Sequence, residues 1–127
     1  MITEDYVSFE TANLLKEKGF DWECIGYYVD DEPDDVYHSL CGETNSTWES
    51  RCCSAPTLQM AMKFIRKAYF LNISPQFNRW ENNWSVVIRS MDNRNIIKNN
   101  SALEMSGFSS YEDSVEAALQ YCLKNFI

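Results

Sequence analysis

Two adjacent cysteines, Cys52 and Cys53, stand just before a segment with helix-start residues. A helix N-terminus offers free N–H groups and the positive end of the helix dipole, which lower the pKa of a nearby thiol and favour a reactive thiolate. A catalytic cysteine also needs a base, and His38 is the only histidine in the chain. A dyad of His38 with either cysteine is one hypothesis; two small apolar side chains in the interior are the preferred interpretation.

Metal binding is a second chemistry for the same region, because His38, Cys41, Cys52 and Cys53 supply the ligand types of a zinc site. Their spacing lacks the C-x-x-C arrangement that brings two sulfurs to one ion. The acidic run at residues 30–35 lacks the turn glycine and the distal glutamate of a calcium loop. We therefore expect no metal and no cofactor.

Enzyme motifs are missing from the sequence. It holds no phosphate-binding G-x-x-x-x-G-K, no dinucleotide G-x-G-x-x-G and no G-x-S-x-G, and it has only four glycines. Its 19 acidic residues offer many carboxylate pairs, but no local pattern distinguishes one pair as a hydrolytic site. We predict a protein that is not an enzyme.

Cations and exposed aromatics form the best candidate binding residues. The candidates are Lys63, Arg66, Lys67, Arg79 and Trp80. Interleaved arginines and aromatic rings bind single-stranded nucleic acids by stacking and phosphate contact. Trp80 lies in a turn-like polar context, whereas Trp84 has the pattern of a core residue.

The charge is unevenly distributed along the chain, which has a net charge of −8. Residues 1–50 have a net charge of −11, residues 51–98 of +6 and the remaining tail of −3. The simplest interpretation is that acidic and basic surfaces neutralise each other within one fold. The alternatives are that the basic middle binds nucleic acid, which the acidic whole disfavours, or that the acidic half mimics nucleic acid and inhibits a basic protein.

Length and composition predict one globular domain over residues 1–127. Five cysteines are a poor disulfide framework, and the N-terminus resembles no signal peptide. No apolar run reaches the roughly 18 residues of a membrane span. These features predict a cytoplasmic protein that does not interact with membranes.

Three helices are expected, near residues 9–18, 56–69 and 111–125. Ser8 and Gly19 mark the ends of the first helix. The second has Ser54 as its expected N-cap and Pro56 in its first turn. The third starts at Ser109 or Ser110, with a capping-box pattern from Ser109 to Glu112.

Strands are expected between these helices. Residues 24–29 and 84–91 have the clearest strand patterns, and residues 30–35 should form a loop tip. Residues 36–40 and 46–51 either form a hairpin or a long loop. Residues 70–73 begin a strand that Pro75 ends early or confines to a sheet edge. Residues 95–98 and 102–105 are candidate extensions of the sheet. The fold class is therefore α+β, with a three- to five-stranded antiparallel or mixed sheet packed with about three helices.

Four segments carry a family resemblance. They are V-S-F-E-T-A-N-L-L-K-E-K-G-F-D, C-S-A-P-T-L-Q-M-A-M-K-F-I-R, W-E-N-N-W-S-V-V-I-R and S-Y-E-D-S-V-E-A-A-L-Q-Y-C-L. They resemble small uncharacterised proteins of phages, prophages and plasmids of Bacteroides-type gut bacteria. The layout is also similar to phage α/β/α (ABA) sandwich domains. The resemblance implies an accessory role in a mobile element and assigns no site residue.

The predicted function is therefore non-enzymatic binding as a phage- or mobile-element-derived accessory protein. The expected partner is another protein or a second copy of the chain, and a nucleic acid is the disfavoured partner.

Overall fold

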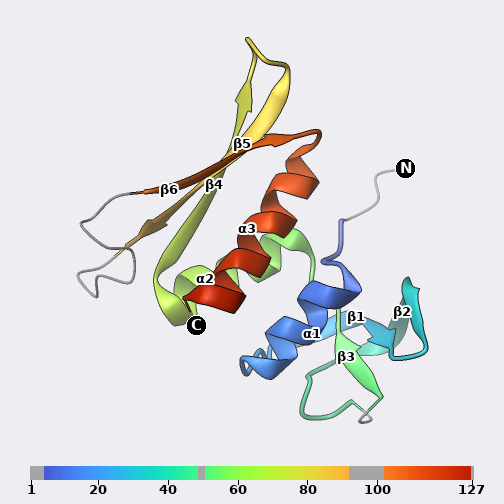
Figure 1. The fold of residues 1–127 in the computed structure, drawn as a ribbon. Coiled ribbons are helices and arrows are strands. Elements are labelled where there is room, and N and C mark those ends of the chain that lie inside the picture. The colour runs from blue at the N-terminus through green and yellow to red at the C-terminus, as the bar shows by residue number, and fades with distance from the viewer. Residues whose placement is uncertain (1–4, 49–50, 92–101, 127) are drawn as a thin grey trace. The chain divides into compact units, whose positions relative to one another are not determined.

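The computed structural model describes residues 5–48, 51–91 and 102–126, which form three helices and six strands (Figure 1). In chain order these are α1 (Phe9–Glu17), β1 (Cys24–Val29), β2 (Glu32–Glu43), β3 (Cys52–Ser54), α2 (Leu58–Tyr69), β4 (Leu71–Asn78), β5 (Asn83–Ser90), β6 (Leu103–Phe108) and α3 (Tyr111–Asn125). The predicted α+β class is confirmed. The strands belong to two three-stranded antiparallel sheets, with the orders β2-β1-β3 and β4-β5-β6.

The chain divides into two compact units, Met1–Met60 and Ala61–Ile127. The first unit contains α1 and the sheet β2-β1-β3, and the second contains α3 and the sheet β4-β5-β6. Helix α2 begins at the end of the first unit and lies mostly in the second. This division does not test the prediction of one domain over residues 1–127, which stays a prediction.

Helix α1 forms where its end signals predict. The Ser8 side-chain oxygen accepts a hydrogen bond from the Thr11 N–H at 3.3 Å, which caps the first turn. At the other end Gly19 has a φ of +86°, and the Phe20 N–H reaches back to the Leu15 carbonyl. Phe20 is then buried beside the helix end, so one glycine both stops the helix and fixes a core residue.

The sheet of the first unit differs from the prediction in two places. Asp30 and Asp31 alone form the turn between β1 and β2, and the rest of the acidic run enters β2. Of the two alternatives for residues 36–40 and 46–51, the hairpin is wrong, because β2 pairs with β1 and residues 45–47 form a turn. The long loop is wrong for residues 36–40, which belong to β2. Residues 49–50 lie outside the described residues. The strand that follows, β3, pairs with the other side of β1.

Helix α2 starts two residues later than predicted. Ser54 belongs to β3 and is not the N-cap, and Pro56 precedes the helix. The Thr57 hydroxyl takes that role and accepts from the Met60 N–H at 3.2 Å. The helix buries one apolar face, formed by Leu58, Ala61, Met62 and Ile65. The helix ends where Phe70 adopts a φ of +57°, and β4 begins at the next residue.

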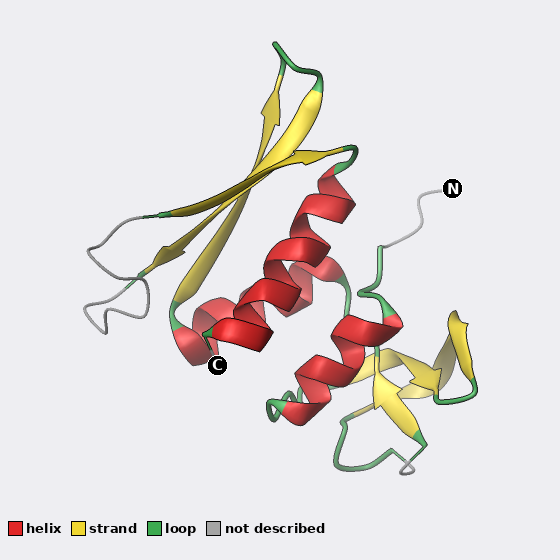
Figure 2. Ribbon diagram, viewed as in Figure 1, coloured by secondary structure: helices red, strands yellow, loops and turns green. Residues whose placement is uncertain are grey.

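Helix α3 packs on all three strands of the second sheet (Figure 2). Ser110 is its N-cap, with the side-chain oxygen accepting from the Asp113 N–H at 3.0 Å. The capping box from Ser109 is wrong, because the Ser109 hydroxyl instead donates to the Asp113 carboxylate. The buried face of the helix comprises Ser114, Val115, Ala118, Leu119, Cys122 and Leu123.

The second sheet is built around a long hairpin of β4 and β5. Eight consecutive pairs join the two strands, from Leu71 with Ser90 to Asn78 with Asn83. Pro75 lies on an edge strand, as predicted, but it does not end the strand. Strand β6 covers the other edge of β5 and contains a register shift near Gly107, whose φ is +88°. Of the predicted extensions, 102–105 overlaps β6 and 95–98 lies outside the described residues.

Candidate functional site

The structure separates the predicted binding residues into two groups at opposite ends of β4. Lys63, Arg66 and Lys67 lie on α2, just before the start of that strand, with Lys63 and Lys67 exposed. Arg79 and Trp80 lie in the loop that follows the strand. An eight-residue strand is about 25 Å long, so the two groups do not form one compact site.

The loop of residues 79–82 closes the β4–β5 hairpin and presents Trp80. Trp80 is 89% exposed, the highest value among the described large hydrophobic side chains that are exposed. The guanidinium carbon of Arg79 lies 5.8 Å from the centre of the indole ring, which is a cation–π distance. In Figure 1 this loop is the end of the hairpin that extends beyond α3. We call Arg79, Trp80 and Glu81 the hairpin tip.

The backbone of the hairpin tip is held by asparagine side chains. The Asn78 side-chain oxygen accepts hydrogen bonds from the Trp80 N–H at 3.1 Å and the Glu81 N–H at 3.4 Å. Asn82 adopts a φ of +54°, a left-handed conformation that asparagine tolerates better than most residues. The exposed indole therefore projects from an ordered turn.

Aromatic contacts support the loop end of the same hairpin. Phe77 and Trp84 pair across the two strands with ring centres 5.4 Å apart, and Trp84 contacts Tyr111 of α3 edge to face at 5.5 Å. These contacts fix the hairpin on the helix. Phe77 is still 51% exposed, so the loop end of the hairpin carries a second exposed aromatic side chain besides Trp80.

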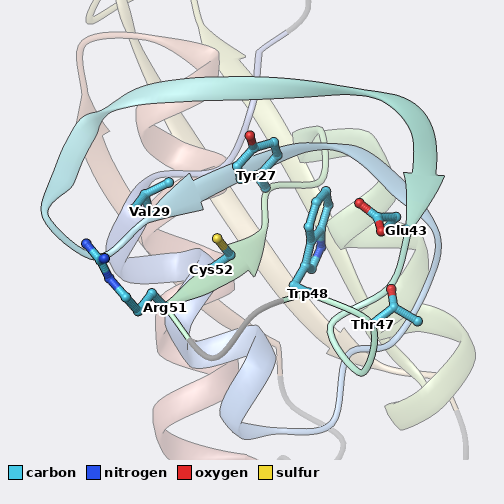
Figure 3. A pocket seen from close by; sticks show the side chains of 7 residues that line it. All are labelled: Tyr27, Val29, Glu43, Thr47, Trp48, Arg51 and Cys52. Atoms are coloured by element: carbon cyan, nitrogen blue, oxygen red, sulfur yellow. The ribbon is translucent and has the colours of Figure 1, made fainter.

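The first unit contains a pocket of about 510 Å³ (Figure 3). Its lining residues are Tyr27, Val29, Glu43, Thr47, Trp48, Arg51 and Cys52. The rings of Tyr27 and Trp48 lie 4.5 Å apart and form one wall. Figure 3 shows Arg51 and Glu43 on opposite sides of these rings. The volume falls within the range of about 300–1,000 Å³ that is typical of ligand pockets.

Hydrogen bonds hold the Trp48 wall in place. The indole N–H of Trp48 donates to the Ser54 hydroxyl at 2.6 Å. The Asn45 side chain accepts from the Ser54 N–H at 2.8 Å and donates to the Phe20 carbonyl at 2.7 Å. The Thr47 N–H donates to the Thr44 carbonyl and closes the turn that precedes Trp48. The pocket is thus formed before any ligand arrives.

Arg51 contributes the cationic side of the pocket. Its Nη2 donates to the Asp31 carboxylate at 2.6 Å, and both side chains are well exposed. A guanidinium has five N–H donors, so this ion pair leaves other donors available for a second acceptor.

The thiol and zinc hypotheses gain no geometric support. Burial raises the pKa of the Cys53 thiol to about 11, with the Lys16 ammonium acting in the opposite direction. That direction is the reverse of what a reactive thiolate needs. His38 lies against Tyr6, with 3.1 Å between Nε2 and the tyrosine oxygen. Within residues 5–48, 51–91 and 102–126, no three His, Cys, Asp or Glu side chains gather closely enough to hold a metal ion.

No protein-family model, no curated protein and no solved structure matches the chain. Among the described helices, none has the length and apolar character needed to cross a membrane.

Sequence reasoning identified Trp80 and missed the pocket. Trp80 was recognisable because asparagines and charged residues surround it. Tyr27 and Trp48 are 21 positions apart in the sequence, and their meeting depends on the turn at residues 45–47 and on β3 pairing with β1. Nothing in the sequence distinguishes these two aromatic residues from the other aromatic residues of the chain.

Proposed function

We propose that this protein is a non-enzymatic binding protein that contacts a protein partner through the hairpin tip. The exposure of Trp80 carries the proposal. Leaving a large indole in water on an ordered turn forgoes the stability that its burial would give. Tryptophan and arginine are also enriched among residues that dominate protein interfaces.

The charges around the tip favour a protein over a nucleic acid. Arg79 is followed by Glu81 in the loop, and the neighbouring first turn of α3 carries Glu112 and Asp113. Tyr111 of that turn contacts Trp84 near the loop of the hairpin, which brings these carboxylates to the same end of the sheet. A polyanion would meet several carboxylates there and one arginine.

Nucleic-acid binding by α2 is the second candidate. Lys63 and Lys67 are exposed and share the polar side of the helix with Arg66. A gel shift at low salt tests it, with the three cations changed to alanine as the comparison. Binding that weakens as salt rises and with these changes would support it, and the lack of a complex at low salt would remove it.

Photocrosslinking at position 80 tests the protein-binding proposal. A photoreactive phenylalanine replaces Trp80 in protein expressed in its natural host, and light-dependent adducts are identified by mass. The matched control carries the same group at Met91, which is 55% exposed and follows the opposite end of β5. We expect adducts at position 80 well above those at 91. Equal or missing adducts at position 80 would overturn the proposal.

The proposal also includes the mobile-element origin and the cytoplasmic location of the protein. The resemblance to phage- and plasmid-borne proteins supports a mobile-element accessory role, and the reduced-cysteine composition supports the cytoplasm.

A further inference from the structure

We infer that the partner of the hairpin tip is a second copy of this chain, whose Tyr27–Trp48 pocket receives Trp80. The inference rests on the proposed function, because it takes the hairpin tip as the contacting surface. It adds the identity of the partner and the site on that partner.

The chemistry of the two surfaces is complementary. The hairpin tip is an aromatic side chain with a cation before it and a carboxylate after it, in the order Arg79, Trp80, Glu81. The pocket has an aromatic wall, with the carboxylate of Glu43 on one side and the guanidinium of Arg51 on the other (Figure 3). With Trp80 against Tyr27 and Trp48, one direction of insertion pairs Arg79 with Glu43 and Glu81 with Arg51.

The sizes and the rigidity of the two surfaces also agree. A volume of about 510 Å³ accommodates an indole ring together with part of the loop that carries it. Aromatic rings that meet edge to face or offset add about 0.5–1.5 kcal/mol beyond the burial of their area. Both surfaces are held by side-chain hydrogen bonds, at Asn78 in the hairpin and at Asn45 and Ser54 beside the pocket. Little ordering is therefore needed on association.

The contact joins two different surfaces of the same chain. Such a heterologous contact closes into a ring or continues as an open chain, depending on the rotation between successive copies. Each copy has a net charge of −8, so repulsion between copies opposes the contact at low salt. Association is best measured near 0.15 M salt, where the screening length is about 8 Å.

Sedimentation of the purified protein is the first test. From about 1 µM to about 1 mM protein, the range in which contacts of modest affinity saturate, we expect the mean mass to rise above that of one chain. Trp80→Ala should weaken association at least about tenfold, as expected for an interface hot spot. The matched control is Met91→Ala, which should associate like the unchanged protein. A monomer at every concentration would overturn the inference.

A charge exchange tests the pairing itself. Arg79→Glu places two carboxylates in the contact, and Glu43→Arg places two cations there, so each variant alone should remain monomeric. Mixing the two variants creates opposite charges in both directions of insertion and should restore association. If the mixture stays monomeric while the unchanged protein associates, the contact is not the one inferred.

A filled pocket provides an independent variant. Val29 lines the pocket at the end of β1, and Val29→Phe fills part of it without removing the Trp48 hydrogen bond. We expect loss of association with an unchanged circular dichroism spectrum. Association of folded Val29→Phe protein at full strength would exclude this pocket.

Crosslinking of purified protein separates this inference from the proposed function. A photoreactive group at position 80 should form adducts within residues 27–52 of a second copy. Adducts in host cells with other proteins, and none in the purified protein, would leave the proposed function in place and overturn the inference. No adducts in either sample would overturn both.

Discussion

The β1–β2 hairpin and the β4–β5 hairpin differ in their regularity and in what they carry at their turns. In β4 and β5 all eight pairs are consecutive, and the loop presents Trp80. In β1 and β2 the register shifts twice, and the two-residue turn consists of Asp30 and Asp31. The regular ladder carries an exposed aromatic side chain at its loop end. The interrupted ladder bends β2 around β1, beside the pocket of the first unit.

The first interruption in β2 has a compositional cause. The pairs Val29–Glu32 and Tyr27–Tyr37 enclose one residue of β1 but four residues of β2. Strand β2 therefore has three extra residues here, which are Pro33, Asp34 and Asp35. A second excess lies between the partners of Gly26 and Cys24. Proline and closely spaced carboxylates have low strand propensity, which accounts for the first excess in this edge strand. Strand β4 keeps a regular register despite Pro75, so a proline alone does not interrupt a ladder; the interrupted strand differs in having Asp34 and Asp35 beside Pro33.

The largest expected effect concerns the cores of the two units. Ile88 in β5 and Leu15 in α1 are both fully buried, so Ile88→Ala and Leu15→Ala should each cost about 2–5 kcal/mol of unfolding free energy. Because the residue contacts cluster into two units, we expect each change to speed amide hydrogen exchange mainly in its own unit. Hydrogen-exchange mass spectrometry measures this. Equal acceleration in both units would mean that they unfold as one.

The next effect is a loss of stability at high pH that differs between the units. Burial raises the pKa of Cys122 to about 12, and burial is also the main cause that raises the pKa values of Cys24 and Cys53 to about 11. The folded state therefore holds these protons more tightly than the unfolded chain, whose thiols titrate near 9. The stability that these protonated thiols contribute is fully present below pH 9 and decreases as the pH rises. The decrease ends near pH 11 in the first unit and near pH 12 in the second.

Denaturant unfolding between pH 8 and pH 12 measures this loss of stability. Each unit of difference between the folded and unfolded pKa corresponds to about 1.4 kcal/mol of unfolding free energy. Cys122→Ala should lose less stability over that range than the unchanged protein. A parallel decline in the two proteins would contradict the predicted role of this thiol.

A smaller effect is expected at the serine caps of α1 and α3. Ser8→Ala and Ser110→Ala each remove the side-chain acceptor of a first-turn N–H, which costs about 1 kcal/mol. Ser109→Ala is the control, since that hydroxyl contacts an exposed carboxylate and does not cap the helix backbone. Urea midpoints measure the three changes. A Ser109→Ala effect as large as that of Ser110→Ala would contradict the assigned cap.

The smallest effects compare the two turns directly. Asn78→Ala removes the acceptor for two loop N–H groups and should cost about 1 kcal/mol while loosening Trp80. Asp31→Asn weakens an exposed ion pair with Arg51 and should cost well under 1 kcal/mol. Thermal unfolding and tryptophan fluorescence anisotropy report both changes. The opposite ranking would show that the ion pair of the first hairpin matters more than the turn of the second.

Local rules predicted the parts of the fold that depend on neighbouring residues. Ser8 and Gly19 identified the ends of α1, and the alternation around Val86 and Ile88 identified β5, because caps and pleat periodicity are properties of short segments. The predicted cap at Ser54 failed for a physical reason: pairing with β1 and a bond from Trp48 gave that serine a better place in β3.

Long-range features were beyond such rules. The division of the strands into two sheets depends on which partners β1 and β5 choose, and many pairings satisfy the same patterns. The pocket arises only after β3 has joined β1. Trp80 was predictable because its exposure follows from its own loop, whereas Tyr27 and Trp48 become a wall only through pairing.

Pro75 and the shift near Gly107 also affect how the second sheet meets its surroundings. Strands β4 and β6 are the outer strands, and an outer strand with a regular row of free N–H and carbonyl groups invites another chain to extend the sheet without limit. Pro75 removes one donor from β4, and the irregular register near Gly107 disturbs β6. Both features make these edges poor templates for cross-β pairing, so uncontrolled growth through the sheet edges is disfavoured whatever contact the exposed indole makes.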